Sequence, residues 1–209
     1  MRWQRGDVTV EMIDEPGYSL GSADNGRTYS NEYVLGPWSR HCSRHGVVCV
    51  MPEVPVGTAL IAGSGGGTGV HTHSLALLDD RCCAAVGNTV VCMGLPDLAL
   101  RWHVQGDQAT CFGVHLTHDQ SFVVVHGELE ISLLTLEGQR VWSCSGRDVF
   151  TGDLKVDEQT VHVVDFNGAR YTIGLETGRI VEAAEQAVSG LLRQEGSDVS
   201  SSNLRSLKP

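Results

Sequence analysis

The sequence predicts an all-β fold built from repeated units of about 40 residues. The chain contains 25 glycines but only 6% aromatic residues, a composition that suits many short strands joined by turns. Residues 121–128 (SFVVVHGE) contain a short apolar run, and residues 160–168 (TVHVVDFNG) alternate between apolar and polar residues. Each segment ends in residues that favour a turn. These segments recur along the chain, which indicates a repeat.

The repeat is clearest at the turns that follow these segments. Leu136 and Leu175 are 39 residues apart, and Trp102 and Trp142 are 40 apart. A third, weaker unit spans 82–102 (CCAAVGNTVVCMGLPDLALRW). A period near 40 made only of short strands has the size of one four-stranded propeller blade, which must stack on its neighbours to cover its apolar faces. We therefore expect a stack of such sheets, with both tryptophans filling the gaps between units.

The turns at 135–142 (TLEGQRVW) and 174–181 (GLETGRIV) resemble the quinoprotein-like (PQQ-type) β-propeller repeat. The resemblance covers roughly residues 75–181 and implies a propeller fold. It does not imply quinone binding, because no cofactor-binding residue of that family can be matched in this chain.

We divide the chain into four parts. Residues 1–70 form an irregular β-rich part of the same domain, 71–181 the propeller-type repeats, 182–195 a C-terminal helix and 196–209 a disordered tail. The helix is predicted because several apolar residues share one face at helical spacing: Ala184, Ala187, Val188, Leu191 and Leu192. Three or four units are few for a closed ring, so we expect an exposed sheet edge and a possible homodimer.

The charge balance excludes several functions. The 209 residues carry 25 acidic and 15 basic side chains, a formal net charge of −10. Nucleic acids and anionic membranes favour a basic surface, so neither is an expected partner. No run of 18 apolar residues and no secretory signal is present, and the cysteines number seven, which is odd. We therefore expect reduced thiols and a cytoplasmic protein.

One alternative is a small metal-dependent enzyme. Gly65 and the sequence His71-Thr72-His73 resemble the first half of the cupin motif, with Asp79 or Asp80 near the position of its glutamate. Histidines at i and i+2 of a strand point to the same face, as metal ligands must. The second half of that motif is missing, and the competing interpretation is a polar strand edge that faces solvent.

A zinc site is a further possibility around His41, Cys42, His45 and Cys49, completed by Cys82, Cys83 and Cys92. The ligand spacing is irregular, so we favour a polar loop that leads into a strand with a core cysteine. The other histidines are expected to be packed or surface residues: His103, His115, His118, His126 and His162.

The weakest alternative is a nucleotide-binding oxidoreductase. The run Gly63–Gly69 matches the glycine spacing of a short-chain dehydrogenase loop, which binds pyrophosphate at a helix start. That interpretation needs a helix at 70–86 and a Tyr-x-x-x-Lys pair, which the chain lacks. The leading prediction is a non-enzymatic β-propeller-type module, a scaffold or adaptor that binds a protein partner. No catalytic or cofactor-binding residue is assigned.

Overall fold

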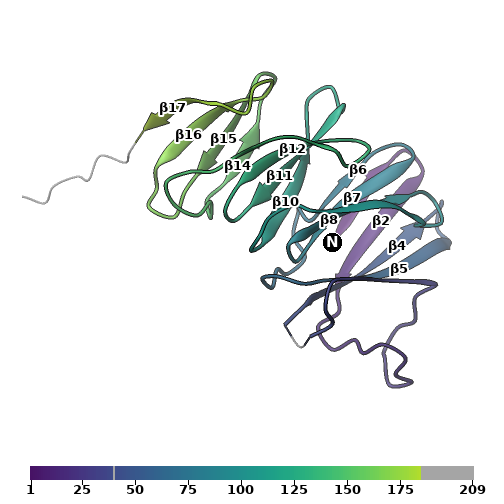
Figure 1. Cartoon of the computed structure of the whole chain (residues 1–209). Coiled ribbons are helices and arrows are strands. Elements are labelled where there is room, and N and C mark those ends of the chain that lie inside the picture. The colour runs from purple at the N-terminus through teal and green to yellow at the C-terminus, as the bar shows by residue number, and fades with distance from the viewer. Residues whose placement is uncertain (40, 185–209) are drawn as a thin grey trace, which may run out of the picture.

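The structure is a computed structural model that describes residues 1–39 and 41–184. Within these ranges the chain forms seventeen strands and no helix, which confirms the all-β prediction. The strands make four sheets that follow one another along an arc (Figure 1). Accordingly, none of the described segments is a helix that could cross a membrane.

The first sheet has five strands. Their order is β1 (Arg2–Arg5), β2 (Val8–Asp14), β4 (Ser43–Val50), β5 (Pro55–Gly63) and β3 (Asn31–Leu35). Neighbouring strands are antiparallel except for β3, which runs parallel to β5. Three of these strands, β2, β4 and β5, contain most of the short apolar segments VTVEMI (8–13), VVCVM (47–51) and TALIAG (58–63). This sheet departs from the repeat because its edge strand β3 comes from earlier in the chain than its neighbour.

The other three sheets are four-stranded antiparallel meanders in chain order. The second sheet contains β6 (Leu75–Leu77), β7 (Arg81–Val86), β8 (Thr89–Gly94) and β9 (Leu100–Gln105). The third contains β10 (Cys111–Leu116), β11 (Phe122–Gly127), β12 (Ile131–Thr135) and β13 (Arg140–Cys144). The fourth contains β14 (Leu154–Val156), β15 (Thr160–Val164), β16 (Arg170–Gly174) and β17 (Ile180–Ala184). These are propeller-type blades, as the 40-residue period predicts.

The hydrophobic core lies between the sheets in three layers. In β7, Cys82 and Ala84 face the first sheet, whereas Cys83 and Ala85 face the third. Because successive strand residues point to opposite faces, a sheet covered on both sides needs apolar residues at every position. The fourth sheet ends the described stack, and its β15 alternates between buried Val161 and Val163 and less buried neighbours.

Adjacent sheets are joined by a repeated aromatic contact. Trp102 Nε1 donates to the Leu136 carbonyl at 2.8 Å, and Trp142 Nε1 donates to the Leu175 carbonyl at 2.8 Å. Each indole also packs on a turn residue of the next sheet, Gly138 and Gly178 respectively. The expected role of both tryptophans is confirmed.

The glycines in these turns have two functions. Gly138 and Gly178 have φ angles of +81° and +65°, a left-handed conformation that glycine adopts without strain. A Cβ at Gly178 would lie 2.6 Å from the ring of Trp142. The glycine thus permits both the turn and the close approach of the indole.

A tyrosine makes the corresponding contact between the first two sheets. The Tyr33 hydroxyl donates to the Leu98 carbonyl at 2.9 Å and accepts from the Leu100 amide at 3.0 Å. Leu98, at φ +57°, precedes Gly138 by 40 residues. In the fourth sheet, strand register puts exposed Glu182 where the tryptophans stand in the second and third. The aromatic series therefore ends with the fourth sheet.

The predicted C-terminal helix overlaps the described residues only at 182–184. There the chain continues β17, whose Ala183 and Ala184 pair with Tyr171 and Arg170 of β16. Pairing with a preformed strand satisfies the backbone here, which outweighs a helical preference based on a few alanines. The remainder of that prediction, 185–195, and the predicted disordered tail lie outside the described residues.

We predict that Trp142→Ala lowers the free energy of unfolding by about 3 kcal/mol, because it removes most of an indole packed between two sheets. Trp142→Phe keeps an aromatic ring but loses the hydrogen bond, so its cost should be nearer 1 kcal/mol. Urea unfolding measures both changes.

The matched control for these variants is Phe166→Ala. The Phe166 side chain is 70% exposed, so its loss should change stability by less than about 0.5 kcal/mol. If Trp142→Ala behaved like this control, the indole would not be the joint between the third and fourth sheets.

Candidate functional site

Residues 63–66, the first part of the glycine run, pack closely against neighbouring segments. Gly63 ends β5, and a Cβ there would collide with the carbonyl oxygen of Val86. At Gly65, where φ is +99°, a Cβ would come within 2.7 Å of the Asn88 side chain. Residues 70–86 contain β6 and β7 instead of the helix that a nucleotide-binding loop requires. Gly63, Gly65 and Gly66 thus permit close packing, whereas a Cβ at Gly67 would meet nothing within 4 Å. The nucleotide-binding alternative gains no support.

Two of the possible zinc ligands, Cys42 and His45, contact different residues. Cys42 is buried and its thiol lies 3.0 Å from the Ser39 carbonyl. His45 is fully buried on β4, with Nδ1 3.2 Å from an Asp14 oxygen. Among the described side chains, no three from His, Cys, Asp and Glu form a group that could hold a metal ion.

His71 and His73 belong to a cluster of four histidines. Both are exposed and lie in the turn before β6, so they do not share a strand face as the cupin resemblance implies. The His73 ring stacks on His115 at 4.4 Å between centroids, and His115 lies 6.5 Å from His126. These four residues line a pocket of about 380 Å³ together with Asp153 and other residues preceding β14.

His115 and His126 were expected to be ordinary packed or surface residues. They lie on the neighbouring strands β10 and β11, where His126 pairs with Gly113 and His115 is two residues further along. Side chains two residues apart share a face, so the hairpin register alone could have placed these histidines together. The clustering with His71 and His73 needs the second sheet and could not be read from one hairpin.

Burial sets the charge of this cluster. It lowers the pKa of His115 to about 3 and that of His126 to about 4, and the nearby His73 adds to both shifts. The Nε2 atoms of both rings are buried without a hydrogen-bond partner. The two imidazoles are therefore neutral at pH 7. Although the four histidines lie close together, they do not form a group that could hold a metal ion.

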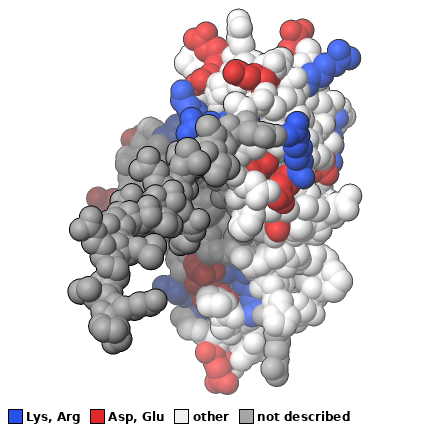
Figure 2. Space-filling view, turned by 90° about the vertical axis from the view of Figure 1, so that its left-hand side faces the viewer, with Lys and Arg blue, Asp and Glu red and all other residues white. Residues whose placement is uncertain are grey.

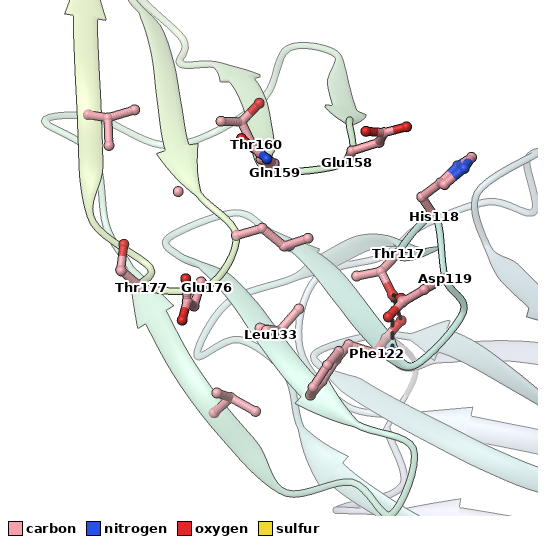
Figure 3. Close-up of a pocket in the computed structure, with 14 residues that line it drawn as sticks. Thr117, His118, Asp119, Phe122, Leu133, Glu158, Gln159, Thr160, Glu176 and Thr177 are labelled. Carbon is pink, nitrogen blue, oxygen red and sulfur yellow. Dashed lines mark hydrogen bonds between the residues drawn. The ribbon is translucent and has the colours of Figure 1, made fainter.

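A larger cleft of about 910 Å³ opens between the third and fourth sheets (Figure 3). Leu133 of β12 and Phe122 of β11 lie at its base, and Leu175 lines it from the β16–β17 turn. Val141 and Val181 are 49% and 64% exposed and continue this apolar surface onto the outer strands β13 and β17. Exposed apolar side chains next to a cleft are typical of binding surfaces.

Turns from both sheets form the polar rim of the cleft. The β10–β11 turn supplies His118 and Asp119, the β14–β15 turn supplies Glu158, and the β16–β17 turn supplies Glu176. Asp119 is held in place because it accepts a hydrogen bond from the Thr117 hydroxyl at 2.6 Å and another from the Ser121 amide at 3.1 Å. These contacts lower the pKa of Asp119, which is therefore charged at neutral pH.

Comparisons with known proteins support the fold alone. No protein family and no curated protein matches the sequence. Among solved structures, BamB from Moraxella catarrhalis, a β-propeller, superposes with a TM-score of 0.54 at 13% identity, covering 88% of this chain and 63% of that one. The WD40 β-propeller domain of Doa1 matches with a TM-score of 0.47 at 15% identity, covering 73% of this chain and 53% of that domain. The present chain thus spans less than two thirds of either protein.

We predict that the histidine cluster makes stability depend on pH. Each buried imidazole has a folded-state pKa of about 3 or 4, below its ordinary value of about 6.5. The unfolded chain therefore binds more protons between these values, so stability is full above about pH 6.5 and falls as the pH is lowered. At pH 5 the loss should be about 2 kcal/mol for each histidine.

Urea unfolding at pH 7.5 and pH 5.0 measures this loss. The double variant His115→Asn/His126→Asn should lose clearly less stability on acidification, whereas His103→Asn, at an exposed position of β9, should behave as the unmodified protein does. An equal loss in all three proteins would mean that other groups cause the pH dependence.

Proposed function

We propose that this protein is a non-enzymatic β-propeller-type scaffold or adaptor that binds a protein partner in the cleft between its third and fourth sheets. The observation that carries the proposal is an open cleft with an apolar base and a charged rim, next to exposed Val141 and Val181. An apolar centre inside a polar rim is the usual anatomy of a protein interface. The sheets supply a rigid frame, and the turns at their ends supply the contacts.

Two finer features belong to the same proposal. We assign the repeat to the quinoprotein-like type because Leu175-Glu176-Thr177-Gly178 follows that family's turn, with glycine at its left-handed position. We place the protein in the cytoplasm, where thiols stay reduced. The support is that all seven cysteines are free thiols, six of them buried, although Cys83 and Cys92 lie opposite each other on β7 and β8.

Photocrosslinking tests the cleft as a partner site. A photoreactive benzoylphenylalanine in place of Val181 should give a discrete adduct in an extract of the source cells, and the identified partner, once purified, should form the same adduct. Val54 is the matched control because it is 62% exposed, close to the 64% of Val181, but lies outside the cleft. The same adducts at both positions, or none at Val181, would contradict the proposal.

We also propose that the protein forms a homodimer through a free strand edge. All five residues of β17 are exposed, and within the described residues its outer edge pairs with no other strand. Unpaired backbone groups on such an edge favour pairing with a second chain. Light scattering at micromolar concentration should give twice the monomer mass of 22.5 kDa, and the monomer mass would refute the dimer.

A further inference from the structure

We propose that the segment bound in this cleft is a peptide whose apolar side chains are flanked by Lys or Arg. This inference rests on the proposed function and adds the chemistry of the partner. It follows from two features of the cleft that differ in kind, the apolar base and the sign of the charge around it.

The apolar base favours aliphatic or aromatic side chains. Leu133 is 3% exposed and Phe122 is partly buried, so both are fixed by the sheet beneath them. Val141 and Val181 lie on the outer strands of the two sheets. Both are exposed and belong to none of the core clusters, so the core does not require an apolar residue at either position. A partner side chain that covered these two valines would remove apolar surface from water, which favours binding.

Apart from His118, the ionisable side chains on the rim are acidic. Three carboxylates line the cleft, from Asp119, Glu158 and Glu176, and none of its fourteen lining residues is a Lys or Arg. Figure 3 shows Leu133 between the side chains of Glu176 and Asp119, with Glu158 across the opening. A cation held beside an apolar side chain would therefore meet a carboxylate on either side of the base.

The two glutamates are available for such a contact. Within the described residues, neither the Glu158 nor the Glu176 side chain makes an ion pair or a hydrogen bond, whereas Glu11, Glu15 and Glu130 each pair with an arginine. Both glutamates are exposed at the rim, so a partner's cations reach them with little loss of hydration.

The part of this end of the molecule that is uncovered in Figure 2 carries no broad basic patch. Figure 2 looks onto the end that lies at the left in Figure 1, where the fourth sheet is. There the visible side chains are largely uncharged, and Lys, Arg, Asp and Glu are scattered without a broad basic field. No basic field that would offset the acidic rim of the cleft is visible in this uncovered part.

Binding of a labelled probe peptide to the full-length chain tests this inference. The probe has the sequence KLRFKL, and the comparison peptide ELEFEL keeps the apolar residues but reverses the charges. We expect KLRFKL to bind at least tenfold more tightly by fluorescence anisotropy at low salt, and this preference should shrink in 0.5 M salt because the carboxylates are exposed.

Substitutions assign the binding to the cleft. Glu158→Gln/Glu176→Gln should weaken KLRFKL about tenfold. The control Asp24→Asn/Glu53→Gln makes the same charge change at exposed residues outside the cleft and should leave the affinity unchanged. Val141→Ser/Val181→Ser should weaken both peptides, and circular dichroism should show that this variant is still folded, since both side chains are already exposed.

Several results would overturn the inference. Equal binding of the two peptides, or equal effects of the cleft and control variants, would show that the charged rim does not select the partner. If KLRFKL failed to bind while Val181→Ser dissociated a dimer, the cleft would belong to a second copy. If it bound only after Arg205→Ala/Lys208→Ala, the chain's own C-terminal segment would be the occupant. A specific adduct at Val181 without peptide binding would leave the proposed function standing and refute only this peptide chemistry.

Discussion

The whole architecture depends on the burial of both faces of each inner sheet by its neighbours. A four-stranded sheet of about 30 residues has no core of its own, so its apolar side chains stay in water until another sheet covers them. Cys82 and Cys83 on β7 illustrate this, because one packs towards the first sheet and the other towards the third. The tryptophan contacts add direction to this stacking, since each indole hydrogen-bonds a carbonyl in the next turn.

The same constraint explains where the functional surface lies. The third and fourth sheets are in contact through their core residues and through Trp142, and the cleft lies between them beside the β16–β17 turn on which Trp142 packs. Leu133 serves both the core and the base of the cleft, so the binding surface stands on residues that stability already fixes. The rim, in contrast, consists of turn residues that can change without disturbing the sheets, which allows one frame to acquire different partners.

The sequence predicts the repeated sheets well because local patterns determine them. Continuous apolar runs occur in β7, β8 and β11, whose sheets are covered by a neighbouring sheet on both faces. Alternation occurs in β15, whose sheet is covered on one face within the described residues. The strand order of the first sheet could not be predicted, although its β-rich character could, because placing β3 parallel to β5 depends on contacts between distant segments. The helix predicted from 182 fails at its first residues because β16 offers Ala183 a backbone partner, a tertiary effect that periodicity does not contain.

The functional residues were harder to predict than the fold. The spacing of His71 and His73 suggested a shared strand face, but both residues lie in a turn. The residues that cluster with them, His115 and His126, come from another sheet. The carboxylates of the cleft are single residues in separate turns, at 119, 158 and 176, and no motif connects them. Only the stacking of two sheets brings their charges around one apolar base.

The most direct test of this account is a methyl NMR titration of valine-labelled full-length protein with the KLRFKL peptide. The account predicts that the methyl signals of Val141 and Val181 shift with saturation. Val54 and Val56, which are 62% and 46% exposed on the first sheet side of the molecule, should not move. Shifts at Val54 and Val56 without shifts at Val141 and Val181 would show that the peptide binds elsewhere and would contradict the assignment of the cleft.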